Sequence, residues 1–234
     1  MGCAKSLTPC LPKVATVAYR DASFKFYIPD AMTDKMQLAP LLGWYHERSL
    51  LEAFHSVVDS NGTICDLGAN FGSHTVYFAA IMKARRVHSF EPQAHLIDVI
   101  KKTLELNQID NVTLHHAVAG AKLGKAHLKW THAENSGMAE FRPGAGDLPV
   151  DMLPVDDVVG EEHVTGVKID VEGMQMPVLR GMSKTIRRCA PVLWLELRPA
   201  KGEIEQPSEW LAKRGYRRQK ISFRDFLFIP ETSA

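Results

Sequence analysis

Apolar residues along the chain follow two alternating spacings. Short, nearly continuous apolar runs are typical of buried strands, and apolar residues three and four positions apart are typical of helices. The runs predict strands at Thr63–Leu67, Val87–Glu91, Val112–Ala117, Gly166–Val171 and Val192–Leu197. Helical spacing covers Trp44–Val58, Ser73–Ala84, Ala94–Leu106, Met174–Arg188 and a segment near Ser208–Lys213. This alternation predicts an α/β fold with a doubly wound, mostly parallel sheet.

The two ends of the chain depart from this alternation. Residues 1–43 form an N-terminal extension with short extended runs at Val14–Tyr19 and Phe24–Ile28, followed by an irregular linker at Pro29–Gly43. The pattern therefore divides the chain into this extension and one main domain, residues 44–234.

The C-terminal strands predict a hairpin. Between Arg217–Ile221 and Phe226–Ile229 lie only the residues Ser222–Asp225, too few for a crossover, so these strands should pair antiparallel. Such a hairpin at the end of a doubly wound sheet is the architecture of Rossmann-like, class I methyltransferases. Residues Gly120–Val150 are richer in glycine and polar residues, and we expect loops there, with one short strand at Ala126–Trp130.

Composition narrows the class of protein. Lysine and arginine number 28 against 27 acidic residues, and this near-neutral balance argues against a general nucleic-acid binder. No apolar run approaches the length of a membrane span. The four scattered cysteines favour a reduced, cytoplasmic protein. Gly2 fits a short myristoylation pattern, although an unmodified N-terminus is the ordinary alternative. Oligomeric state stays open, and a homo-oligomer is compatible with the sequence.

A glycine-bearing turn after the first buried strand predicts a nucleotide-shaped pocket. Gly68 and Gly72 allow close approach of a ligand, because no Cβ obstructs it. Glu91 ends the next strand, where a carboxylate grips a ribose diol in such folds. Asn70 occupies the place of a middle glycine, and Asp66 would repel a pyrophosphate. Both features favour S-adenosylmethionine (SAM) over NAD, and the alternative is a turn that binds nothing.

A second unusual stretch carries three charges in register. Strand alternation places Lys168, Asp170 and Glu172 on one face, although central parallel strands are normally apolar on both faces. A carboxylate there could accept the proton of an attacking hydroxyl, and Lys168 could keep the carboxylates ionised. The structural alternative is a buried ion pair. On the next strand Glu196 is a candidate for substrate binding.

Three segments together resemble the FkbM family of SAM-dependent methyltransferases: Asp66–Gly72, Ser89–Pro92 and Lys168–Gly173. The similarity extends from about Glu47 to Pro199. It implies a class I fold and methyl transfer, usually to oxygen, on acceptors such as sugars, glycans and natural-product small molecules.

The resemblance also implies roles for individual residues. Cofactor binding is implied for Asp66, Gly68, Asn70, Gly72, Glu91, Ala117 and Val118, and substrate binding for Asn135 and Ser136. His74 could contact the SAM carboxylate, act as a base, or be an ordinary helix-start histidine. The chain departs from the family at Gln175, where glutamate is frequent, and at Arg198, where histidine is frequent.

The resulting hypothesis is a SAM-dependent O-methyltransferase with Asp170, Glu172 and Lys168 as catalytic residues. A small-molecule or glycan hydroxyl is the expected acceptor. A divalent metal held by Asp170 and Glu172 would lower the pKa of a bound hydroxyl, but we do not favour it, since the resemblance requires no metal. The alternative function is a SAM-binding, non-catalytic or regulatory interaction module.

Overall fold

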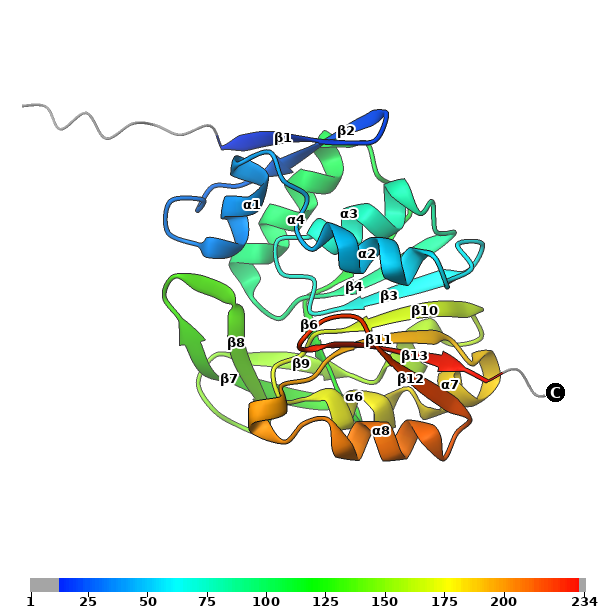
Figure 1. Ribbon diagram of the computed structural model, residues 1–234. Helices are drawn as coiled ribbons and strands as arrows, with labels where there is room; N and C mark the ends of the chain where they lie inside the picture. Colours follow the sequence, from blue (N-terminus) through cyan, green and yellow to red (C-terminus); the bar gives the residue numbers. More distant parts are fainter. Residues whose placement is uncertain (1–12, 232–234) are drawn as a thin grey trace, which may run out of the picture.

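A computed structural model describes residues 13–231, so Gly2 lies outside the described residues. Its centre is a seven-stranded sheet in the order β12-β13-β11-β10-β3-β4-β5 (Figure 1). The strands are β3 Thr63–Leu67, β4 Arg86–Phe90, β5 Val112–His115, β10 Val164–Ile169, β11 Val192–Glu196, β12 Tyr216–Lys220 and β13 Asp225–Pro230. All neighbours pair in parallel except β13, which is antiparallel to both β11 and β12. The doubly wound sheet and its antiparallel C-terminal hairpin are confirmed.

Helices cover both faces of this sheet. One face carries α2 Arg48–His55, α3 Ser73–Val76 with its continuation η2 Tyr77–Ile81, and α4 Ala94–Leu106. The other carries α5 Val155–Val159, α6 Gln175–Gly181, α7 Ser183–Cys189 and α8 Glu205–Ala212. Each face has its own hydrophobic cluster, because successive strand side chains point in opposite directions. On β3, for example, Ile64 joins the first cluster while Cys65 and Leu67 join the second.

The segment expected to form loops instead forms a second sheet. Its order is β6-β9-β7-β8, from β6 Ala117–Ala119, β7 Gly124–His132, β8 Asn135–Pro143 and β9 Pro149–Leu153. The expectation of loops across Gly120–Val150 was therefore wrong, although the short strand expected at Ala126–Trp130 lies within β7. Many side chains of β7 and β8 are half-buried or exposed, so no clear apolar period marks these strands. The strand expected at Val112–Ala117 divides between the two sheets.

The N-terminal segment packs into the main hydrophobic cluster. Strands β1 Val14–Tyr19 and β2 Ala22–Tyr27 form an antiparallel hairpin whose Tyr19 and Phe26 are buried there. The expected irregular linker contains two short helical turns, η1 Lys35–Gln37 and α1 Leu38–Leu41.

Two expected helices have different bounds in the structure. The first, α2, begins only at Arg48, and the helix expected over Met174–Arg188 is broken at Met182. A 3₁₀ turn, η3 Pro199–Lys201, follows β11. Across residues 13–231 there is no helix with both the length and the apolar character that a bilayer crossing requires.

Candidate active site

A pocket opens at the carboxyl ends of β3, β4, β10 and β11, where strand β8 of the second sheet faces it. The predicted site residues that line it are Gly68, Asn70, Glu91, Ala117, Val118, Asn135, Ser136, Asp170, Glu172 and Glu196. Four others do not line it: Asp66, Gly72, His74 and Lys168. They are buried beside it or form the turn beneath it. Segments distant in sequence therefore converge on one cavity.

The turn after β3 contains three residues with positive φ, a conformation that glycine and asparagine adopt more readily than other residues. Gly68 has φ +92°, Asn70 φ +52° and Gly72 φ +87°. A Cβ on Gly68 would lie 2.0 Å from the carbonyl oxygen of Asp170. The turns after β3 and β10 thus touch each other, and their contact requires glycine.

Glu91 anchors the other side of this turn. One carboxylate oxygen accepts the backbone N–H of Asn70 at 2.8 Å, and the other accepts that of Gln93 at 2.8 Å. Burial raises the pKa of Glu91 to about 7, while these N–H donors oppose the rise. A carboxyl held in this way can accept hydrogen bonds from a diol.

The pocket rim joins three parts of the chain through Ser136. The hydroxyl of Ser136 donates to Asp34 Oδ2 at 2.6 Å, and Asn70 Nδ2 donates to the same hydroxyl at 3.0 Å. Gln93 Nε2 donates to the Ser136 carbonyl at 3.0 Å. Because Asp34 belongs to the N-terminal segment, that segment helps to set the position of β8 over the pocket.

Lys168 is a buried cation between carboxylates. Its Nζ lies 3.0 Å from Asp170 Oδ2, 3.8 Å from Asp66 Oδ1 and 3.3 Å from the Gly68 carbonyl oxygen. Asp66 also accepts a hydrogen bond from Thr75 at 2.7 Å. The structural alternative, a buried ion pair, is therefore present, and it adjoins the pocket because Asp170 lines it.

The pKa values of Asp170 and Glu196 are shifted in opposite directions. Burial alone would raise the pKa of Asp170, but the charge of Lys168 and a hydrogen bond from Glu196 lower it. The charge of Asp170, followed by burial, raises the pKa of Glu196 to about 9. Arg224 lies 3.6 Å from Glu196. The pair thus presents one carboxylate and one carboxylic acid to the pocket.

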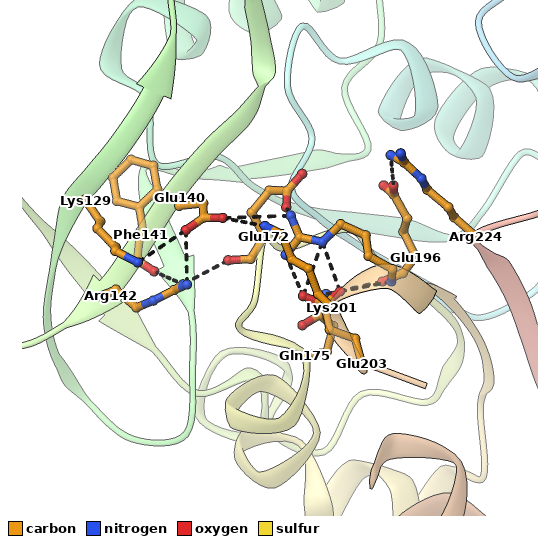
Figure 2. Close-up of polar contacts among 11 residues, drawn as sticks. Lys129, Glu140, Phe141, Arg142, Glu172, Gln175, Glu196, Lys201, Glu203 and Arg224 are labelled. Carbon is orange, nitrogen blue, oxygen red and sulfur yellow. Dashed lines mark hydrogen bonds and ion pairs between the residues drawn. The ribbon is translucent and has the colours of Figure 1, made fainter. Parts of the chain in front are cut away.

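Glu172 is engaged in a different network, shown in Figure 2. Its carboxylate pairs with Arg198, which also binds Glu203 through Nη2 at 2.6 Å. Arg142 on β8 donates to the Glu172 carbonyl at 3.0 Å and pairs with Glu140 at 3.2 Å. These contacts attach the second sheet to the turn after β10. The Glu172 carboxylate is therefore already paired with a guanidinium.

Comparison with known proteins decides the family. Residues 66–218 match the family model described as Methyltransferase FkbM domain, which is more than half of the chain. The chain belongs to the FkbM methyltransferase family. Methyltransferase 1 of the fungus Beauveria bassiana is 24% identical in an alignment of 177 residues that covers 65% of this chain and 71% of that protein.

A solved FkbM methyltransferase shares the fold. The crystal structure of the protein from Methylobacillus flagellatus KT superposes with a TM-score of 0.55 and 17% sequence identity. The match covers 76% of the present chain and half of the Methylobacillus chain. At this identity the likeness shows the Rossmann-like methyltransferase fold, as the sheet order independently does.

This chain departs from the residues frequent in the FkbM family at Gln175 and Arg198, and both side chains lie in the network around Glu172. Gln175 Nε2 donates to the Glu196 carbonyl at 3.3 Å and to Glu203 at 3.4 Å. Within residues 13–231, no group of three or more His, Cys, Asp or Glu side chains is arranged to hold a metal ion.

Sequence reasoning missed several pocket residues of this FkbM chain, among them Glu47, His46, Gln93 and Arg224. Glu47 and His46 precede a helix in a stretch without a strand-end signal, so no local pattern marked them. Of these four residues, only Gln93 lies close to a predicted strand end, two residues after Glu91. His74 is buried against Glu47, with Nε2 3.2 Å from Oε2.

Proposed function

We propose that the protein transfers the methyl group of SAM to a hydroxyl of a small-molecule or glycan acceptor. The observation that carries this proposal is the convergence of Gly68, Glu91 and Asp170 on one pocket. These residues come from three strand ends of a fold that methyltransferases use. The family assignment supports the general reaction, and the carboxyl groups of Asp170 and Glu196, which both line the pocket, support a hydroxyl acceptor.

The residues present fit SAM. Glu91, held by two backbone N–H groups, would accept hydrogen bonds from the ribose hydroxyls. Gly68 lines the same pocket as Glu91. Ala117 and Val118 would border the adenine with small apolar surfaces, one end of the pocket being walled by the second sheet. When bound, SAM supplies a methyl group already activated by a sulfonium.

Asp170 would serve as the proton acceptor. Its carboxylate would accept the proton that the acceptor hydroxyl gives up when it takes the methyl group. Glu196, as the protonated partner, would hold the acceptor oxygen or Asp170 in line by hydrogen bonding. Glu172 would not act as a base, because its carboxylate is paired with Arg198. It would instead help to hold the turn after β10 in place. Asn135 and Ser136 would contact the acceptor from β8.

Calorimetry with SAM and S-adenosylhomocysteine is the first test, and micromolar binding of both is expected. The second is a scan for transfer of labelled methyl from SAM to sugars, glycans and small phenols. Cofactor binding without any transfer would favour a non-catalytic SAM-binding module instead. Failure to bind either compound at millimolar concentration would remove the proposal.

A further inference from the structure

Glu47 is a pocket residue that lies outside the stretch matched by the family model. It is the residue before α2 and has a left-handed backbone, with φ 52° and ψ 35°. Non-glycine residues adopt this conformation at a cost, and it is concentrated at functional sites. The side chain does not cap its own helix. It lies against His74 on the pocket side instead.

Buried aromatic packing holds this conformation in place. The hydroxyl of Tyr45 donates to the Ser73 carbonyl at 2.9 Å, which ties the residue preceding His46 and Glu47 to the start of α3. The Tyr45 ring packs edge-on against Tyr19, Phe26 and Tyr77. The N-terminal hairpin thus helps to position Glu47.

The electrostatic surroundings distinguish Glu47 from the other pocket carboxylates. Asp170 pairs with Lys168, Glu196 lies near Arg224, and Glu172 pairs with Arg198. Glu91 accepts two backbone N–H groups. Among the described residues, Glu47 has only histidine neighbours at ion-pair distance, His74 at 3.2 Å and His46 at 3.9 Å.

Glu47 is nevertheless ionised. Burial acts to raise its pKa, but His74, whose Nε2 lies 3.2 Å away, and the charges of His46 and Lys168 together lower it to about 2. Its side chain is half-buried, so a face of the carboxylate stays open to the pocket. An ionised carboxylate without a lysine or arginine partner is suited to bind a cationic ligand group.

We propose that Glu47 receives the α-ammonium of the methionine part of SAM. The inference rests on the proposed function, and it deepens it by assigning the amino-acid end of the cofactor. An ammonium donates hydrogen bonds to a carboxylate, whereas a sulfonium has no N–H or O–H to donate, so the ammonium is the better-matched cation. Gly68 and Asn70 line the same pocket, which leaves Glu91 for the ribose.

The test compares S-adenosylhomocysteine with 5′-methylthioadenosine, which lacks the amino-acid end. Both are titrated into wild type, Glu47→Gln and the matched control Glu52→Gln, which removes a carboxylate of α2 that pairs with Arg48. We expect Glu47→Gln to weaken S-adenosylhomocysteine binding about tenfold or more, and 5′-methylthioadenosine by less than about twofold. Glu52→Gln should change neither. Glu47→Asp, which keeps the charge, should lose less than Glu47→Gln.

Several results would overturn the inference. One is an equal loss for both ligands in Glu47→Gln, which would indicate a general packing role. Another is no loss for either ligand. SAM is titrated into the same variants, and a larger loss for SAM than for S-adenosylhomocysteine would assign Glu47 to the sulfonium instead. If wild type binds 5′-methylthioadenosine and S-adenosylhomocysteine equally well, nothing receives the ammonium. Binding of no ligand by wild type would instead remove the proposed function itself.

Discussion

The Nζ atom of Lys168 lies 3.0 Å from Oδ2 of Asp170, although both residues come from the same strand and the turn that follows it. The pair is part of the core on one side and of the pocket on the other. Burial opposes ionisation of Asp170, but the Lys168 charge and a hydrogen bond from Glu196 together lower the pKa of Asp170. Asp170 is thus both a member of a structural ion pair and the candidate base.

Asp170→Asn should reduce turnover by about 100-fold or more, because the proton acceptor is lost. SAM affinity should change by less than about threefold, since the residue is proposed to act on the acceptor. Steady-state kinetics and calorimetry measure the two effects. Asp110→Asn, an exposed position, is the control and should retain full activity. Unchanged turnover in Asp170→Asn would exclude it as the base.

Lys168→Met should destabilise the fold by about 3–5 kcal/mol, because Asp66 and Asp170 would lose their common buried cation. Urea denaturation followed by circular dichroism measures this free energy of unfolding. Lys102→Met removes an exposed pair with Glu105 and should change stability by less than about 0.5 kcal/mol. Equal effects of the two substitutions would mean that the buried pairs of Lys168 contribute no more to the free energy of unfolding than an exposed pair does.

Gly68→Ala should cost at least about 3 kcal/mol of stability, since backbone strain at φ +92° adds to a clash with the Asp170 carbonyl. Gly215→Ala is the matched control, because φ is +76° there and nothing lies within 4 Å of the added Cβ. It should cost only about 1 kcal/mol. S-adenosylhomocysteine affinity should fall in the first variant alone. Similar stability losses in both would show that strain, not contact between the turns, dominates.

Glu196→Gln should change how stability depends on pH. The folded-state pKa of Glu196 is raised to about 9, so its contribution to stability is complete below the unfolded pKa of about 4.5 and is lost as pH rises through about 9. Glutamine does not titrate. The melting temperature of the variant relative to wild type should therefore increase between pH 5 and pH 9, by at least about 2 °C. A constant difference across this range would contradict the raised pKa of Glu196.

Local periodicity was enough to predict the main sheet. The predicted strand Thr63–Leu67 and the predicted helix Ala94–Leu106 agree with β3 and α4 at both ends. The reason is that β3 is buried along its whole length and α4 has a continuous apolar face, so the apolar residues of both segments follow a clear period. The second sheet could not be predicted in the same way. Strand β9 pairs in parallel with the distant β6, and β8 has few fully buried positions.

By itself, the sequence determined which strand ends meet at the pocket: Gly68, Glu91 and Asp170 follow apolar runs whose length and order predict a shared sheet edge, and all three line the pocket. Only the tertiary structure decided how these groups are partnered. It paired Glu172 with Arg198, shifted the pKa values of Asp170 and Glu196 in opposite directions, and brought Glu47 to the pocket from before the matched domain. The physical reason is that apolar burial repeats at short range along the chain, whereas charge compensation depends on contacts between segments far apart in sequence.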